Sequence, residues 1–216
     1  MKLKHFLQLI ILFLFFAIPT AFSQLTDTDV REARFWAEGK GKQIVDILTS
    51  SSGDKYQRLD NILHNDVDLE YAAKFVIGKY WRQMSEEQQE TYLDLFDRYV
   101  SAAYKTYPLN IQEGDVSFTV DKILPENKII NIFCTVFVKN IEQNVDEQSQ
   151  GGIKVIFALV KDGDTFKVRD LKIQESSFLQ SYRTRFYKMI HEDSDDEIEW
   201  FLEDFENLVI ENENNS

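Results

Sequence analysis

The side chains that most often carry chemistry are few in this 216-residue chain, and their spacing does not suggest a catalytic or metal site. The chain has three histidines, of which His64 and His191 lie far apart with no carboxylate spacing around them. A histidine-based metal site is therefore not expected, because such sites gather several ligands at short and regular intervals. Each of these two histidines is interpreted as solvent-exposed or locally hydrogen-bonded.

The acidic residues offer two further candidates for chemistry. The run Glu192–Glu197 could attract a divalent cation, but a loop and helix start is preferred, because acidic groups favour the positive end of a helix dipole. Asp170 is the best candidate for a catalytic acid, which would have to be buried with a raised pKa. Its position on a predicted strand beside a bend suits a structural role instead. No phosphate loop, nucleophile elbow or paired catalytic carboxylate is present, so the sequence predicts neither an enzyme nor a cofactor.

Cys134 is the single cysteine and lies in the apolar segment INIFCTVFV. It cannot form an internal disulfide, and in this setting it is interpreted as a small buried core residue. Stability must therefore come from an apolar core, which a chain of this length can build.

The N-terminal segment has the pattern of a secretory signal peptide. Lys2 and Lys4 form a basic start, an apolar run extends from Phe6 to Ile18, and small residues precede a predicted cleavage point near Ser23. The apolar run is short for a membrane span, which needs roughly 20 residues; an uncleaved anchor is the alternative. We expect an exported protein.

The chain remaining after cleavage is strongly acidic. It would have 22 Lys and Arg residues against 37 Asp and Glu residues, a formal charge of −15. Such a chain repels phosphate backbones and anionic membrane surfaces, so nucleic acid is not expected as a partner. Its length fits one domain.

Aromatic residues are abundant, with seventeen Phe, nine Tyr and three Trp. Helices that back a twisted antiparallel sheet can enclose a hollow, and pockets for apolar ligands are lined by such side chains. The alternative is that these residues close-pack in a core. The pattern alone favours this alternative, because most aromatic residues at helical spacing belong to a core.

The elements that would position these side chains begin with helices. Apolar residues recur at helical spacing over residues 34–50, and Asp54 and Asp68 are predicted to cap the second and third helices. The third helix is expected to end near Gly78.

A fourth helix begins at a capping box formed by Ser85 and Gln88, carries aromatic residues on one face, and is predicted to stop at Pro108. The period then changes to two, which is typical of half-buried strands. Turns are expected at Pro125–Asn127 and at the Asp-Gly pair that includes Gly163. The four predicted strands cover residues 116–121, 128–140, 152–161 and 165–173.

Helical spacing returns over residues 178–190 and 198–205. The fold class predicted is therefore α+β, with N-terminal helices, a four-stranded twisted antiparallel sheet and C-terminal helices that together enclose an apolar pocket. One domain is expected over residues 24–210. The polar residues 211–216 are predicted to be a disordered tail.

Two segments resemble the MlaC family, also called the toluene-tolerance family, of periplasmic phospholipid-binding proteins. VIGKYWRQMSEEQQETYLDLFDRYVSAAYKTY is similar to the family's Leu/Ile-Gly-x-Tyr-Trp/Tyr-Arg segment, its Thr/Ser-x-Glu-Gln stretch and its long aromatic helix. FKVRDLKIQESSFLQSYRTRF is similar to the family's Trp-x-Val-x-Asp segment and its Ser-Tyr-Arg-x-x-Phe segment. The resemblance spans roughly residues 30–208.

The chain departs from the family pattern at two places. Gln174-Glu175 stand where the family has Glu-Gly, so the local turn is expected to differ. The acidic run Ser194–Glu197 replaces the glycine-bearing start of the family's last helix. Both departures concern the C-terminal rim more than the pocket.

The resemblance implies a monomeric carrier of phospholipid in the periplasm, without a cofactor or metal. Its implied partners are an inner-membrane ABC transporter complex containing an MCE-domain protein and an outer-membrane lipoprotein–porin complex. Each buried CH₂ is worth about 0.8 kcal/mol, so an acyl chain leaves a bilayer only for an equally apolar enclosure. The alternatives are an enzyme of a cone-like α+β fold acting on a small apolar substrate, and a periplasmic protein-binding adaptor.

The residues predicted to contact lipid come from the aromatic helices and from one face of the sheet. They are Phe75, Val76, Tyr80, Trp81, Phe96, Tyr99, Tyr104, Val136, Val138, Val155, Phe157, Leu159, Ile173, Tyr182 and Phe186. Gly78 is expected to allow close backbone approach or a sharp turn. Arg82 is interpreted as pairing with a carboxylate or a helix end, with contact to a phosphate as the alternative.

Overall fold

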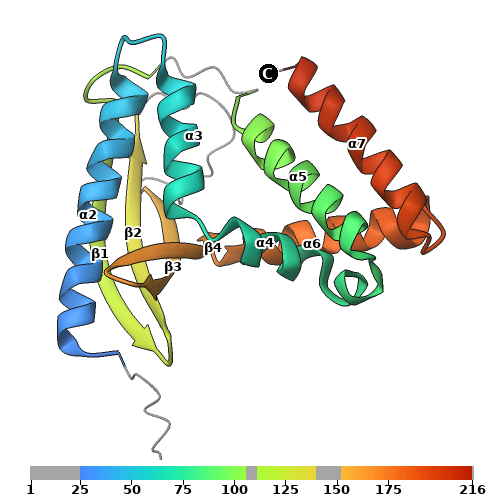
Figure 1. The fold of residues 1–216 in the computed structure, drawn as a ribbon. Helices are drawn as coiled ribbons and strands as arrows, with labels where there is room; N and C mark the ends of the chain where they lie inside the picture. Colours follow the sequence, from blue (N-terminus) through green and yellow to red (C-terminus); the bar gives the residue numbers. More distant parts are fainter. Residues whose placement is uncertain (1–24, 106–110, 140–151, 216) are drawn as a thin grey trace, which may run out of the picture.

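The computed structural model describes residues 25–105, 111–139 and 152–215. The predicted signal segment, Pro108 and the last residue lie outside these ranges. The fold is a single-domain α+β arrangement, as predicted, in which helices precede and follow an antiparallel sheet (Figure 1). No helix within the described ranges is both long and apolar enough to cross a membrane.

The sheet is a meander in which each strand pairs with its sequence neighbour in the order β1-β2-β3-β4-β5. Its strands are β1 (Val116–Glu126), β2 (Ile129–Val138), β3 (Ile153–Asp162), β4 (Thr165–Ile173) and the two-residue β5 (Ser176–Ser177). The first four correspond to the predicted strands, and β5 is an addition. Pro125 lies inside β1 rather than in the turn, which is tolerated because β1 is an edge strand.

The helices form two groups around this sheet. They are α2 (Asp27–Thr49), α3 (Lys55–Asp66), α4 (Leu69–Ile77), the 3₁₀-helix η1 (Gly78–Gln83), α5 (Glu86–Ala103), α6 (Phe178–Lys188), the π-helix η3 (Met189–Asp193) and α7 (Ile198–Asn214). Figure 1 shows α2 and α3 side by side with the strands, and α5 beside α7 on the other side of the molecule. Helices α4 and α6 pack together and contact β4, which links the two groups.

Short-range capping explains several helix boundaries. The Ser85–Gln88 capping box is present as predicted, and Asp68 accepts a hydrogen bond from the Tyr71 amide at the start of α4. Asp54 stands at the predicted position before α3, but its side chain makes no capping hydrogen bond, so that prediction was wrong in its mechanism.

The C-terminal tail was also predicted incorrectly. Residues 211–214 continue α7 rather than forming a disordered tail. The last turn of α7 is fixed to α5, because the Arg98 guanidinium donates to both carboxylate oxygens of Glu213, at 2.9 and 2.8 Å. A bidentate pair of this kind orders a helix end that composition alone would leave frayed.

The apolar residues are divided between two clusters. The helical cluster contains these buried residues of α4 to α7: Ala72, Ala73, Val76, Ile77, Tyr80, Met84, Tyr92, Leu95, Phe96, Tyr99, Phe186, Ile190, Phe201, Phe205 and Val209. The sheet cluster contains Ala33, Ala37, Ile130, Ile132, Cys134, Leu159 and Phe166, where α2 lies on one face of the sheet. The interpretation of Cys134 as a buried core residue is confirmed.

Candidate functional site

The face of the sheet that meets α2 carries a continuous row of apolar side chains, which we call the inner face. Cross-strand pairing places Val136 beside Phe118, Val138 beside Val116, and Val155 between its neighbours Cys134 and Ile173. Paired residues point to the same face of a sheet. The inner face therefore brings together the predicted sheet residues Val136, Val138, Val155, Phe157, Leu159 and Ile173.

Coverage of the inner face changes from one end to the other. Leu159 is fully buried beneath α2 in the sheet cluster, and Val155 is also buried. Val136, Val138 and Ile173 are only half-buried. The apolar row thus extends beyond the part of the sheet that the helices seal.

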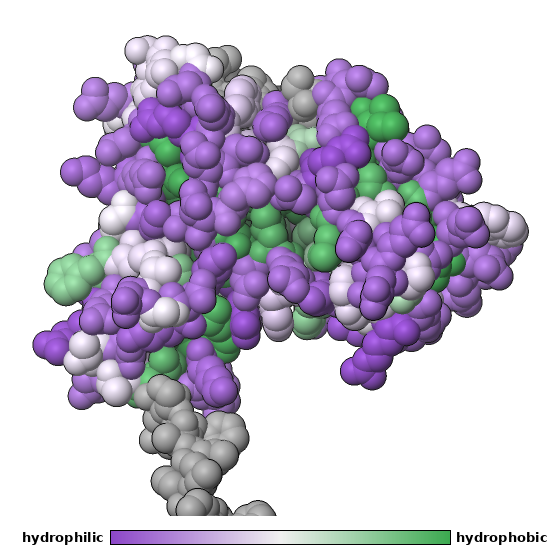
Figure 2. All heavy atoms as spheres, viewed as in Figure 1, coloured by the Kyte–Doolittle hydropathy of each residue, from purple (hydrophilic) through white to green (hydrophobic). Residues whose placement is uncertain are grey.

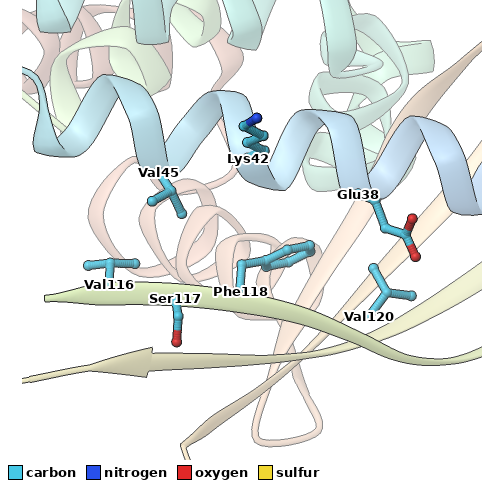
Figure 3. A pocket seen from close by; sticks show the side chains of 7 residues that line it. All are labelled: Glu38, Lys42, Val45, Val116, Ser117, Phe118 and Val120. Carbon is cyan, nitrogen blue, oxygen red and sulfur yellow. The ribbon is translucent and has the colours of Figure 1, made fainter. Parts of the chain in front are cut away.

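A cavity of about 280 Å³ opens between α2 and β1 at the less covered end (Figure 3). Its lining consists of Glu38, Lys42 and Val45 from α2 and Val116, Ser117, Phe118 and Val120 from β1. By register, Val116 and Phe118 adjoin Val138 and Val136, so the cavity borders the half-buried part of the inner face. Figure 2 shows apolar atoms reaching the surface in the middle of the molecule.

Gly41 sets the distance between α2 and β1 at this cavity. A Cβ at Gly41 would come within 2.2 Å of a ring carbon of Phe118, so the ring lies directly against the helix backbone. The same ring contacts Phe157 edge-on at 6.5 Å between centroids. Phe118, which the sequence reasoning did not single out, therefore separates the cavity from the deeper part of the inner face. Its alternation with Val116 and Val120 was the available signal.

Seven predicted lipid contacts lie in the helical cluster or pack against it. These are Val76, Tyr80, Trp81, Phe96, Tyr99, Tyr182 and Phe186. Their aromatic rings pack against other rings of the cluster; the Phe186 ring, for example, lies 5.0 Å from that of Phe205 between centroids. None of them lines either of the two described cavities. In this structure they belong to a close-packed core, as in the alternative interpretation, and their contact with lipid stays a prediction.

The other two predicted contacts have polar connections. Phe75 is half-buried, and the Arg183 guanidinium lies 5.2 Å from its ring centroid. Tyr104 donates a hydrogen bond from its hydroxyl to Asp60 Oδ1 at 2.6 Å, which joins α5 to α3. Burial, reinforced by this hydrogen bond, raises the pKa of Tyr104.

The two segments that resemble the same family meet in space at Gly78. This residue has φ 56° and ψ −117°, and a Cβ there would lie 2.4 Å from the Tyr187 hydroxyl and 2.8 Å from an Arg183 nitrogen. Only glycine fits such a position. The Tyr187 hydroxyl also accepts a hydrogen bond from the Lys79 amide at 3.1 Å. The turn at Gly78 is thus structural: it joins α4 to α6.

Arg82 does not make the contact that was predicted for it. Its side chain is exposed on η1, and no ion pair with a carboxylate is formed within the described part of the chain. Arg183 is the arginine that is packed between helices, where it donates to the Phe75 carbonyl oxygen at 3.3 Å.

The acidic candidates have structural partners. Asp170 Oδ1 accepts hydrogen bonds from the amides of Leu171, at 2.9 Å, and Leu179, at 3.3 Å, so it fixes the start of α6. In the acidic run, Asp196 accepts from the Tyr80 hydroxyl at 2.6 Å and pairs with His191 at 2.8 Å. Among the described residues no group of three or more His, Cys, Asp or Glu side chains is arranged to hold a metal ion.

The predicted departure at the C-terminal rim takes the form of a tight turn. Gln174 and Glu175 both have positive φ, 48° and 70°, and connect β4 to β5. Two consecutive left-handed residues are the geometry of a type I′ hairpin turn, which glycine would adopt with less strain.

A second cavity, of about 260 Å³, lies between α3, α5 and α7. It is mostly polar and is lined by Asp60, His64, Asp97, Arg98, Ser101, Ala102, Lys105 and Glu213. Its charged groups pair with one another across the helices rather than facing an open apolar space. The cavity between α2 and β1 is therefore the better candidate for an apolar ligand.

Comparison with known proteins assigns this architecture. The chain matches the family model described as MlaC protein over residues 42–206, about three quarters of its length. The chain belongs to the MlaC family. The match includes the whole sheet, helices α3 to α6, the first half of α7 and both cavities except for Glu38 and Glu213.

Two individual relatives of this MlaC-family chain agree. The Haemophilus influenzae protein named "Intermembrane phospholipid transport system binding protein MlaC" is 30% identical over 86 residues, which cover 38% of this chain. This chain spans only about two fifths (40%) of that curated relative. A solved structure of a phospholipid-binding protein from Ralstonia solanacearum, in complex with a phospholipid, matches with a TM-score of 0.65. That match covers 84% of this chain and 98% of the other at 13% identity, so it is a likeness of fold.

Proposed function

We propose that this MlaC-family chain is a periplasmic carrier that binds phospholipid with the acyl chains against the inner face of the sheet and the head group near solvent. The observation that carries the proposal is the half-buried apolar row at Val136, Val138 and Ile173, which borders the cavity between α2 and β1. The phospholipid complex of the Ralstonia solanacearum protein supports it through the shared fold.

A phospholipid needs a larger enclosure than the cavity between α2 and β1 offers in this structure. Pockets for small molecules usually have about 300–1,000 Å³, and the cavity has about 280 Å³. A lipid with long acyl chains therefore needs α2 or α3 to move away from the sheet. Each methylene that enters gains about 0.8 kcal/mol, so a whole acyl chain provides a large driving force for such a movement.

The compartment and partners follow from the sequence and the family. We infer that residues 1–23 direct export and are removed near Ser23, and that lipid is exchanged with an inner-membrane MCE-protein ABC transporter complex and an outer-membrane lipoprotein–porin complex. The formal charge of −15 that remains after cleavage supports exchange through docked proteins, because anionic bilayers repel so acidic a chain.

The two other functions differ in what they predict. An enzyme would need a free carboxyl group in the apolar site, and the best candidate, Asp170, is hydrogen-bonded to the start of α6. A protein-binding adaptor would need no lipid at all. Bound phospholipid therefore separates the carrier from the adaptor.

The test is the lipid content of the protein purified gently after export to a bacterial periplasm. We expect phospholipid in near-stoichiometric amount by mass spectrometry of an organic extract, because an empty apolar cavity is unfavourable beside available lipid. Circular dichroism on the same sample establishes that the protein is folded. Folded protein with lipid only at the level of an unrelated periplasmic protein would reject the carrier.

A further inference from the structure

Helix α3 is held in place differently from every neighbouring helix. Asp66 is its only buried residue, and no α3 residue belongs to the helical cluster or the sheet cluster. Its apolar side chains Leu59, Ile62 and Leu63 are half-buried. A helix without a packed apolar core has a low free energy of local opening.

Polar contacts fasten α3 at three places. On the α2 side, Lys55 Nζ donates to the Leu48 carbonyl oxygen at 2.8 Å, and Lys40 pairs with Asp66 at 2.6 Å. At the C-terminal end, the Asp68 amide donates to the Val168 carbonyl oxygen of β4 at 2.9 Å. The third place is the α5 side.

The α5 side is joined by side-chain bonds that cross between the two groups of helices. His64 Nε2 lies 2.8 Å from Asp97 Oδ1, and the Tyr104 hydroxyl donates to Asp60 Oδ1 at 2.6 Å. Lys105 Nζ is 4.0 Å from the same Asp60 oxygen. We call the His64–Asp97 and Tyr104–Asp60 contacts the α3–α5 latch.

The geometry of the latch favours a charged imidazole. His64 Nδ1 lies 2.8 Å from the Asp60 carbonyl oxygen, and Nε2 lies 2.8 Å from a carboxylate oxygen. Both partners only accept hydrogen bonds, so both ring nitrogens must donate, and only the imidazolium can do so. A neutral ring would leave one nitrogen lone pair facing an acceptor.

The charges around this ring come from three helices. Asp60 on α3 and Asp97 on α5 are the nearest, and Glu213 on α7 lines the same cavity. The cations Arg98 and Lys105 oppose them, but Arg98 is bound by Glu213 and Lys105 faces Asp60. The acidic groups therefore dominate at His64.

We propose that α3 is a movable cover over the β4 side of the inner face, fastened to α5 by the latch and loosened as His64 loses its proton. Figure 1 places α3 beside α2, and its end is tied to Val168, an inner-face residue of β4. The loop 50–54, which contains Gly53 and is exposed at residues 51–54, joins its other end to α2 and can serve as the hinge. The cover is a property of the chain and does not depend on which ligand the inner face takes.

The direction of the pH effect follows from the pKa of His64. The hydrogen bond to the Asp60 carbonyl, followed by the hydrogen bond and charge of Asp97, raises this pKa above its usual value. The His64–Asp97 contact of the latch is therefore complete below about pH 6.5, the usual pKa of histidine, and is lost as the pH rises through the raised pKa, while the Tyr104–Asp60 contact remains. Low pH therefore favours the closed position of α3, and high pH favours its opening.

Hydrogen exchange of the folded protein tests the cover directly. Protection factors, corrected for the intrinsic exchange rate, are compared for α3 and α2 at about pH 5.5 and about pH 8.5, on either side of the usual histidine pKa. We expect α3 protection to fall about three- to fivefold at the higher pH, the size expected of a half-exposed ion pair. Protection of α2, which packs in the sheet cluster, should not change.

Two variants and one matched control decide the assignment. His64→Gln should hold α3 at the low protection level at both pH values, whereas His191→Gln, which changes the other described histidine, should keep the wild-type response. Tyr104→Phe should lower α3 protection at both pH values and leave the pH response intact. The cover is refuted if wild-type α3 protection is independent of pH, if His64→Gln keeps the response, or if α2 and α3 lose protection together.

Discussion

The helical cluster and the sheet cluster are built from side chains of different shape, and they differ in how completely those side chains are covered. In the helical cluster, the rings of Tyr92, Phe186, Phe201 and Phe205 are fully buried, with centroids 5.0 to 6.4 Å apart. Phe186 meets the other three edge to face, Tyr92 is tilted against Phe201 and Phe205, and Phe201 stacks on Phe205. In the sheet cluster the buried side chains are mostly aliphatic and small. The inner face then continues into half-buried residues that no helix seals.

The difference in packing indicates that the two clusters have different roles. Interlocked rings leave no room for a ligand and give up many contacts if separated, so the helical cluster is a rigid support. On a partly covered aliphatic sheet face, an acyl chain can replace the covering helix with little loss of free energy, because the helix side chains and the acyl chain are both apolar. Binding is therefore expected on the sheet, and stability on the helices.

The largest expected effect comes from removing the central ring of the helical cluster. Phe186→Ala should lower the free energy of unfolding by about 3–5 kcal/mol, because the ring is fully buried among other rings. Phe157→Ala, the matched change on the half-buried inner face, should cost less, roughly 1–3 kcal/mol. Denaturant melts of both variants measure this. Equal losses would mean that the two regions are equally closed.

A second effect tests the turn that joins the helical group. Gly78→Ala should cost about 2–3 kcal/mol, because its φ is positive and the new methyl group meets Tyr187 and Arg183. Gly163→Ala is the control: its φ is also positive, but nothing lies within 4 Å, so about 1–2 kcal/mol is expected. Thermal and denaturant melts distinguish them. If the two variants lose the same stability, the close contact at Gly78 contributes nothing.

The sequence predicted the framework better than the division between core and pocket. Alternation located all four long strands, and β4 agrees residue for residue with its predicted range, because a Gly-containing hairpin bounds it at Gly163. Helical periodicity also found the aromatic face of α5. It could not show that α6 and α7, distant in sequence, would close over that face and bury it.

Other features depended on contacts that no local pattern encodes. The helical residues 211–214 need Arg98, more than a hundred positions away, to receive Glu213. Phe118 matters because it meets Gly41 of another element. Conversely, the inner-face residues were placed correctly, since a period of two fixes which side of a strand faces the helices.

A third change separates binding from stability on the sheet. Val136→Glu places a carboxylate on the half-buried inner face, where we propose that an acyl chain lies. This charge would have no partner of opposite sign, so burying it beneath lipid is unfavourable. We expect bound phospholipid to be lost while the fold is kept, because the site is not close-packed. The adjacent Phe137→Glu, on the opposite face and 41% exposed, should retain lipid. Undiminished lipid in a stable Val136→Glu protein would place the site on another surface.

The smallest expected effect lies at the polar edge of the helical cluster. The Tyr80 hydroxyl, followed by His191, holds the pKa of Asp196 below its usual value. A lowered carboxyl pKa contributes stability that is present above the usual value of about 3.9 and is lost as the pH falls through the lowered one. Asp196→Asn should therefore melt slightly below the wild type at neutral pH, by on the order of 2–4 °C.

The same contact gives this variant an internal check. Burial, with the hydrogen bond to Asp196, raises the pKa of Tyr80 to about 12. Spectrophotometric titration of Asp196→Asn should show one tyrosine ionising at lower pH than in the wild type. The difference in melting temperature should also shrink as the pH falls below about 4, where the unfolded chain takes up a proton at this carboxyl group, and should vanish once the folded protein is protonated as well. A difference that persists in acid would mean that Asp196 stabilises the turn through its backbone geometry, which is left-handed with φ 62°, and not through its charge.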